Sequence, residues 1–266
     1  MNNVGILYIC TGKYSIFWKD FFDSCERYFL CGIEKHYFVF TDSKEIKGTS
    51  NVHVVKETVK GFPLDSLLRF DMFIKIKNQM DKFTYSFFFN SNMRFVRTVS
   101  PIDILPNGKD EKLVALVHPG YYGKNVFNYP YERHKRSTAY VPYDKNAKHY
   151  YYMGSLNGGI TEDYYRLIKT CNENVHKDID NDVMALYHDE SHLNNYLYNR
   201  HDVKKILPSF GFPEDDDLPF EPFIIIQDKV KHGGTYFDKL PKKSYGRRSI
   251  YFIKRKYWSL KWRLGL

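Results

Sequence analysis

Short, nearly continuous runs of apolar residues recur along the chain and are typical of strands covered on both faces of a sheet. They lie at residues 4–10, 36–40, 51–55, 85–89, 113–117, 149–153 and 220–226. Two of the intervening segments, residues 17–29 and 66–80, instead have apolar residues every three or four positions, which predicts helices with one buried side. Ser66 is expected to cap the second of these helices.

Two more helices are expected in the second half of the chain. Thr161 is followed by Glu162 and Asp163, which suit the first turn of a helix, and another helix is expected through Ser191–Tyr198. This order of strands and helices predicts an α/β fold. In such folds ligands bind at the carboxyl ends of the strands, so polar residues at those ends are the first candidates for a site.

Composition narrows the class of protein. The chain has 266 residues, of which 43% are hydrophobic and 27% charged, as expected for one large domain or two small ones. Its four cysteines form no Cys-x-x-Cys pair, which predicts reduced thiols. There is no basic leader and no run of about 18 apolar residues, so a cytoplasmic location is expected.

Positive charge is concentrated at one end of the sequence. The net charge is +9, but nine of the 40 basic residues lie in residues 242–266, which contain no acidic residue. The rest of the chain is neutral, with 31 basic and 31 acidic residues. We therefore expect a body at residues 1–240 and a basic tail at residues 241–266, and a neutral body argues against nucleic acid as a partner.

The tail has an amphipathic pattern. Five apolar residues recur every three or four positions, namely Ile250, Ile253, Tyr257, Leu260 and Leu264. A basic helix of this kind can lie on an anionic membrane with its cations at the headgroups. The alternative from composition alone is a disordered, solvated tail.

The apolar run at residues 85–89 ends in Asn90-Ser91-Asn92. Chains that handle nucleotide sugars often end such a strand in Asp-x-Asp, whose carboxylates hold a divalent cation against a diphosphate. Here both positions are amides, which are poor ligands for a hard cation. Taken alone, the same residues also suit a simple turn.

Three further stretches carry candidate chemistry. His118 follows a strand at a Pro-Gly turn and could hydrogen-bond a sugar hydroxyl, or could be a core histidine. Glycines in Tyr150–Gly159 allow backbone to approach a ligand closely, or serve a turn. The cluster at Tyr187–Asn194 could be only solvated capping at the start of a helix. Alternatively, Glu190 could stabilise a cationic sugar or attack it, because glycosyl transfer develops positive charge at the anomeric carbon.

Together these stretches resemble glycosyltransferase family 6, the family of the histo-blood-group A and B transferases and α-1,3-galactosyltransferase, and especially its bacterial members. The resemblance spans roughly residues 4–235. It rests on the stretches YICTGKY, HYFVFTDS, FFFNSN, HPGYY, YERHKRSTAYVP, YYMGSLNGG and YHDESHLNNYL.

The resemblance implies a GT-A fold with a mixed central sheet flanked by helices, and it assigns roles to particular residues. Glu190 would be the catalytic carboxylate, and His118, Tyr187 and Glu190 would contact the acceptor. Residues expected to bind the nucleotide sugar are Ile9, Thr11, Tyr14, Arg69, Asn90, Asn92, Met153, Gly154, Ser155, Asp189, Lys229 and Lys231.

The activity that the resemblance implies is transfer of galactose or N-acetylgalactosamine from a UDP-sugar, with retention, to the 3-hydroxyl of a β-galactoside, often a 2-fucosylated one. Met153 with Ser155 resembles the arrangement that uses galactose. Bacterial members with Asn-x-Asn are associated with metal independence, so no divalent metal cofactor is expected. Lys229, with Lys231 as second choice, is then expected to offset the charge of the leaving UDP.

The expected setting is the inner face of a bacterial membrane, with a host-like glycan built on a lipopolysaccharide acceptor and the tail on the anionic surface. The alternative from another class is a glycan-binding protein on the same fold that has lost turnover. Glu190 argues against it, because simple binding does not require that carboxylate.

Overall fold

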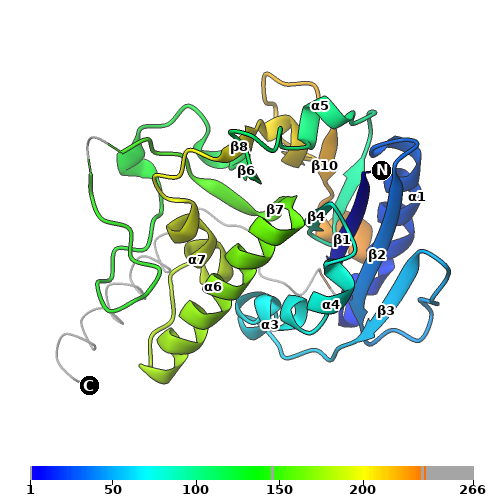
Figure 1. Ribbon diagram of the computed structural model, residues 1–266, viewed down its shortest axis with the longest axis horizontal. Helices are drawn as coiled ribbons and strands as arrows, with labels where there is room; N and C mark the ends of the chain where they lie inside the picture. Colours follow the sequence, from blue (N-terminus) through cyan, green and yellow to red (C-terminus); the bar gives the residue numbers. More distant parts are fainter. Residues whose placement is uncertain (1, 145–146, 235–236, 238–266) are drawn as a thin grey trace. The chain divides into compact units, whose positions relative to one another are not determined.

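The computed structural model describes residues 2–144, 147–234 and 237, and the chain divides into two units, residues 1–228 and 229–266. The first unit is built around a seven-stranded sheet of strand order β3-β2-β1-β4-β7-β6-β8 (Figure 1). Its strands are β1 (Asn3–Ile9), β2 (Glu34–Thr41), β3 (Val52–Lys56), β4 (Tyr85–Phe89), β6 (Leu113–Val117), β7 (Tyr152–Ile160) and β8 (Val203–Ile206). Only β7 runs antiparallel to its neighbours, β4 and β6. The expected mixed α/β sheet is thus confirmed.

A second, three-stranded sheet has the order β5-β10-β9. Its strands are β5 (Met93–Phe95), β10 (Ile224–Ile226) and β9 (Phe212–Pro213). The strand expected at residues 220–226 is therefore confined to its last three residues. β5 follows β4 after a short turn, so the turn at Asn90–Asn92 joins the two sheets.

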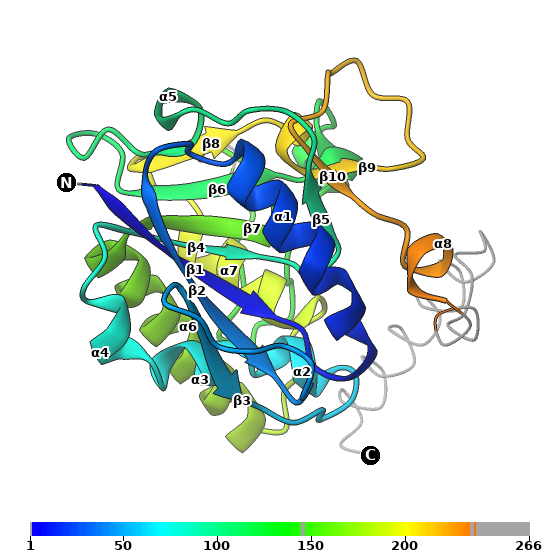
Figure 2. The same cartoon turned by 90° about the vertical axis from the view of Figure 1, so that its right-hand side faces the viewer.

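Helices cover both faces of the large sheet. They are α1 (Trp18–Tyr28), α2 (Leu64–Leu67), α3 (Arg69–Ile74), α4 (Lys77–Met80), α5 (Pro101–Ile104), α6 (Thr161–Asp180) and α7 (His188–Leu197), with 3-10 turns at Gly12–Phe17, Pro119–Tyr121, Val126–Asn128 and Pro208–Gly211. Figure 2 shows α1 on one face and α3, α4 and α6 on the other.

Each face has its own hydrophobic core. Alternate residues of a strand point to opposite faces, so Ile6 and Tyr8 of β1 pack with Phe21 of α1, whereas Leu7 packs with Phe73 of α3 and Tyr164 of α6. Burial on both faces explains why the central strands are nearly continuous apolar runs.

The helix expected at residues 66–80 is three short helices. The backbone leaves helical geometry at Leu68 (φ −95°, ψ 17°) and at Ile76 (φ −108°, ψ 19°), and Ser66 lies inside α2 and caps no helix. The helical spacing misled because Leu67, Phe70 and Ile76 are all buried in the same core across these breaks.

The strand expected at residues 149–153 begins only at Tyr152 and continues to Ile160, so its glycines lie inside a strand and not after it. A Cβ at Gly158 would lie 2.4 Å from both Phe87 Cδ1 and the Ser86 carbonyl oxygen of β4. Glycine is therefore required there by the close approach of β4. The helix expected at Ser191 also begins earlier, at His188.

Of the second unit, the structure describes one short helix, α8 (Lys229–Gly233), with the adjoining Gly234 and Phe237. Residues 241–266, with the amphipathic pattern, lie outside the described residues, so the membrane-binding helix stays a prediction. The boundary between body and tail, placed at residue 240 from charge, also stays a prediction. Among the described helices, none has the length and apolar character needed to cross a bilayer.

Candidate active site

The sheet brings the candidate residues from distant parts of the sequence to one edge. β1, β4 and β6 end at this edge, and the antiparallel β7 begins there, since Phe89 pairs with Leu156 and Val117 pairs with Tyr152. Ile9, Asn90 and His118 stand at the strand ends and Met153–Ser155 at the start of β7. This is the edge at which α/β sheets bind ligands.

Glu190 is held at this edge by two hydrogen bonds. It lies in the first turn of α7; its Oε2 accepts from the Gly154 N–H at 2.7 Å, and its Oε1 accepts from the Tyr151 hydroxyl at 2.8 Å. Both carboxylate oxygens are therefore tied to the beginning of β7, which restricts the orientation of the group.

Arg69 and Asp189 form a buried ion pair beside Glu190. Arg69 Nη1 lies 2.9 Å from Asp189 Oδ2 and also donates to the Gly154 carbonyl at 2.8 Å. Both side chains are nearly inaccessible to water. Because a buried charge without a partner is costly, each member of this pair holds the other in place.

Gly154 connects the two acidic groups through its backbone. Its N–H serves Glu190, and its carbonyl accepts from both Arg69 and Asn157 Nδ2, the latter at 3.1 Å. Asn157 is itself oriented by the Tyr164 hydroxyl at 2.7 Å. The start of β7 thus has a fixed backbone at the point where a ligand would approach.

Burial sets the ionisation of the two carboxyl groups. Burial raises the pKa of Glu190 to about 7, against the opposing effect of its hydrogen bonds from Gly154 and Tyr151. Burial also raises the pKa of Asp189, while the Arg69 guanidinium opposes that rise. Glu190 therefore titrates in the physiological range, as a group at a catalytic site often does.

Several buried polar atoms at this edge have no hydrogen-bond partner within the protein. Among the described residues these include Arg69 Nε, Arg69 Nη2 and Ser155 Oγ. Buried polar groups are almost always satisfied in folded proteins, so each of these donors calls for a partner that a water or a ligand atom would supply. Arginine donors suit phosphate or sugar oxygens.

The two amides of the Asn-Ser-Asn turn are bonded to protein groups. Asn90 Nδ2 donates to Asn92 Oδ1 at 3.2 Å, and Asn92 Nδ2 donates to the Gln227 carbonyl at 2.7 Å. Asn92 is buried and ties the turn to the segment after β10. This donor set has no carboxylate and does not fit a divalent-metal site.

Residues after β1 form the candidate uridine side. Thr11 is buried, and the Gly12 N–H donates to an Asp42 carboxylate oxygen at 2.7 Å. Gly12 has a φ of +57°, which favours glycine and allows the chain to turn sharply after the strand. Tyr14 packs against the core on the α1 side of the sheet.

The candidate acceptor residues flank Glu190 on another side. His118 Nδ1 accepts from the Gly120 N–H at 3.0 Å, and the His118 ring lies 5.8 Å from that of Tyr151. Tyr187 directly precedes α7, and 36% of its surface is exposed. His118 thus lies beside Tyr151, which bonds to the Glu190 carboxylate, and the Tyr187 carbonyl accepts from the Glu190 N–H at 3.0 Å. That these two residues contact the acceptor stays a prediction.

Lys229 and Lys231 lie in α8, in the second unit. That either lysine offsets charge on the leaving nucleotide therefore stays a prediction.

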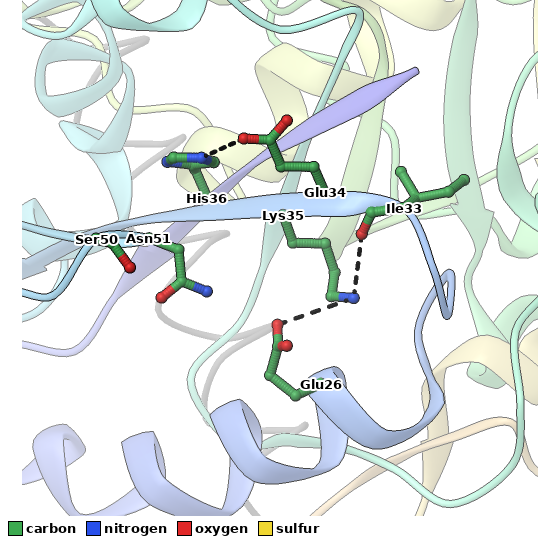
Figure 3. A pocket seen from close by; sticks show the side chains of 7 residues that line it. All are labelled: Glu26, Ile33, Glu34, Lys35, His36, Ser50 and Asn51. Atoms are coloured by element: carbon green, nitrogen blue, oxygen red, sulfur yellow. Dashed lines mark hydrogen bonds and ion pairs between the residues drawn. The ribbon is translucent and has the colours of Figure 1, made fainter. Parts of the chain in front are cut away.

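A pocket of about 510 Å³ lies at the opposite, amino-terminal edge of the sheet (Figure 3). Its lining residues are Glu26, Ile33, Glu34, Lys35, His36, Ser50 and Asn51. Their charged groups pair with one another: Lys35 lies 3.8 Å from Glu26, and His36 lies 2.9 Å from Glu34. None of the candidate residues predicted from sequence lines it.

Sequence analysis missed two residues that shape the site, Tyr151 and Asn157. Alternation along a strand would place Tyr151, Met153 and Ser155 on one side and so could have pointed to Tyr151. No local pattern indicates that Asn157 orients Gly154, since that role depends on Tyr164 in the next helix.

Comparison with known proteins agrees with this geometry. The family model of glycosyltransferase family 6 matches residues 2–221. An O-antigen biosynthesis glycosyltransferase, WbnI, of Escherichia coli is 37% identical over 232 residues, which cover 86% of this chain and 95% of that protein.

Animal proteins are more distant. Histo-blood group ABO system transferase 2 of Rattus norvegicus is 28% identical over 216 residues, covering 78% of this chain and 62% of the relative. Globoside alpha-1,3-N-acetylgalactosaminyltransferase 1 of Gallus gallus is 25% identical over 232 residues, covering 84% of this chain and 65% of the relative. The matched family region contains the large sheet and the whole edge that carries Glu190, and the chain belongs to glycosyltransferase family 6.

Proposed function

We propose that the protein transfers galactose from UDP-galactose to the 3-hydroxyl of a β-galactoside, with retention of the anomeric configuration and without a divalent metal. The observation that carries this proposal is the Glu190 carboxylate, fixed by Gly154 and Tyr151 beside the Arg69–Asp189 pair at the carboxyl edge of the sheet. A carboxylate held in this way is suited to a sugar cation.

Each group has a defined task in this proposal. Ionised Glu190 stabilises the positive charge that develops at the anomeric carbon, or attacks that carbon to form a covalent intermediate. The unpaired donors of Arg69 bind oxygens of the donor. The Asp189 carboxylate accepts a hydrogen bond from a hydroxyl of the donor sugar, and it keeps Arg69 oriented through the 2.9 Å ion pair.

The preference for galactose rests on Ser155. Its hydroxyl is buried and finds no partner within the described part of the chain, and a side chain at this position takes space that the acetamido group of N-acetylgalactosamine would need. N-acetylgalactosamine is the alternative donor. Ser155→Gly is expected to shift the preference toward it.

Metal independence is supported by the Asn90–Asn92 amides, which hydrogen-bond to each other and to the protein. With no carboxylate at either position, the negative charge on the leaving UDP needs a protein cation. Lys229, then Lys231, remains our candidate for that cation.

The acceptor that we propose is a 2-fucosylated β-galactoside on a lipid-linked or lipopolysaccharide glycan, made on the cytoplasmic face of the inner membrane. The Escherichia coli relative is named for O-antigen biosynthesis, which supports this setting. The basic residues 242–266 would hold the enzyme on the anionic surface. The membrane part is contradicted if the full chain fails to sediment with anionic vesicles at low salt.

The deciding experiment measures transfer from UDP-galactose and UDP-N-acetylgalactosamine to 2′-fucosylated lactose and to lactose, each with excess EDTA and with manganese. We expect the highest rate with UDP-galactose and the fucosylated acceptor, undiminished by EDTA. A requirement for manganese would contradict metal independence, and a preference for N-acetylgalactosamine would contradict the proposed role of Ser155. Tight UDP binding without transfer to any acceptor would favour a glycan-binding protein.

A further inference from the structure

Tyr151 belongs to an aromatic cluster formed by residues 118–151, and it connects this cluster to Glu190 by a hydrogen bond. Its ring is fully buried and lies 5.1 Å from that of Tyr121 and 5.6 Å from that of Tyr131. At the rim of this cluster its hydroxyl donates to Glu190 Oε1 at 2.8 Å. Packing against these rings thus holds the Tyr151 side chain with its hydroxyl directed at Glu190.

The phenol can act only as a donor to this carboxylate. Burial and the nearby Glu190 raise the pKa of Tyr151 well above its usual value, so the hydroxyl keeps its proton throughout the working pH range. A hydrogen bond to the charged form of a carboxyl group favours that form. Tyr151 therefore opposes the burial that would otherwise leave Glu190 protonated.

We propose that Tyr151 is a positioning residue for the transfer reaction, which keeps Glu190 ionised and oriented toward the reacting sugar through its 2.8 Å hydrogen bond. This inference rests on the proposed function, in which ionised Glu190 acts on the anomeric centre. It adds a residue that stands in the sequence just before Met153–Ser155 and acts through its hydrogen bond to Glu190.

Other charged groups around Glu190 define what Tyr151 adds. Asp189 on α7 is a neighbouring negative charge that favours protonation of Glu190, and Arg69 on α3 is a positive charge that favours ionisation. The Gly154 N–H on β7 also favours the ionised form. On the acceptor side, the phenols of Tyr187 and Tyr121 lie near Tyr151, and the Tyr121 ring is 5.1 Å from that of Tyr151.

Tyr151→Phe tests the hydroxyl alone, because it keeps the ring and its packing. The matched control is Tyr131→Phe. Tyr131 lies in the same buried cluster, and its hydroxyl donates at 2.7 Å to the Tyr150 carbonyl, away from Glu190. Each variant loses one buried hydroxyl and one hydrogen bond, so only the partner of that bond differs.

The first readout is the pKa of Glu190 itself. It is measured by an NMR titration of protein labelled with carbon-13 at the glutamate carboxyl carbon. The Glu190 signal is identified by its absence in Glu190→Gln. The pKa of Glu190, about 7 in the parent, is expected to rise by about one unit in Tyr151→Phe and to stay within about 0.3 units in Tyr131→Phe. This measurement needs no turnover.

The second readout is the pH profile of kcat/KM for sugar transfer. A rise of about one unit in the pKa of Glu190 lowers the ionised fraction at pH 7 about fivefold, and above about pH 8.5 most of that loss should be regained. A further loss that persists at high pH would measure the orienting effect. KM for the UDP-sugar should change less than kcat, because Tyr151 holds the carboxylate and not the nucleotide.

If Tyr151→Phe does not fold while Tyr131→Phe does, 3-fluorotyrosine placed at position 151 alone takes its place. Fluorine makes the hydroxyl a stronger donor, so the pKa of Glu190 should then fall. An unchanged pKa of Glu190 on altering Tyr151 would overturn the inference. No transfer by the parent, together with the expected change in pKa, would instead overturn the proposed function and leave the Tyr151–Glu190 interaction established.

Discussion

The two edges of the large sheet both carry charged residues, but they use them differently. At the carboxyl edge, Arg69 and Asp189 are buried, and Arg69 Nε and Nη2 have no partner among the residues that the structure describes. At the amino edge, the pocket of Figure 3 has a volume of about 510 Å³, and there Lys35 pairs with Glu26 and His36 with Glu34. It follows that a pocket lined by paired side chains is a weaker indication of a site than buried donors without a protein partner.

The largest expected effect is the loss of transfer in Glu190→Gln. An amide cannot supply the negative charge that the sugar cation needs, so the rate should fall by about 10²- to 10³-fold, while UDP binding persists. The matched change at the other edge, Glu34→Gln, should leave transfer unchanged because Glu34 is exposed and pairs with His36 at the edge away from Glu190. Parallel assays of UDP-sugar transfer compare the two. Equal loss in both variants, or none in Glu190→Gln, would remove the distinction between the edges.

The next effect concerns stability. Arg69→Met leaves Asp189 buried without its cation, which should lower the free energy of unfolding by about 3 kcal/mol. Lys35→Met removes an equally buried cation, but its partner Glu26 remains partly exposed and accepts from the Tyr37 hydroxyl, so the loss should stay below about 1 kcal/mol. Urea unfolding of both variants at pH 7 measures the difference. Similar losses would show that both ion pairs are alike in their contribution.

The smallest effect is the pH dependence of stability that Glu190 imposes. Its folded pKa of about 7 lies above the ordinary value of 4.5, so the folded state holds more protons between these pH values. Stability contributed by the protonated group is present below about pH 4.5 and is lost as the pH rises through 7. From pH 5 to pH 8 the parent should lose about 2 kcal/mol relative to Glu190→Gln.

Urea unfolding of the parent and of Glu190→Gln at pH 5 and pH 8 gives this difference directly. Burial also raises the pKa of Asp189, so Asp189 makes stability pH-dependent in the same direction in both proteins. Its contribution therefore cancels when the two proteins are compared. Glu34→Gln again serves as the control: because it keeps Glu190, it should lose stability between pH 5 and pH 8 to the same extent as the parent. A parent that gains stability from pH 5 to pH 8 relative to Glu190→Gln would contradict the raised pKa of Glu190.

The sequence by itself determined the sheet and the place of the main candidates along it. Apolar runs such as residues 85–89 favoured strands buried on both faces, and the structure has β4 there. The expected helix at Ser191–Tyr198 is present as well, although it begins at His188. The resemblance to glycosyltransferase family 6 also followed from local stretches, and the family match confirmed it. These features depend on residues close together in the sequence.

Tertiary structure decided which polar groups meet. Arg69 and Asp189 are 120 positions apart by their numbering, and Tyr151 and Glu190 are 39 apart, so no local pattern predicts either contact. Gly158 lies inside β7, where the close approach of β4 leaves no room for a Cβ. The helix expected at residues 66–80 is divided into three short helices. Local patterns determine which residues are buried, but only the folded chain determines what each buried polar atom finds as a partner.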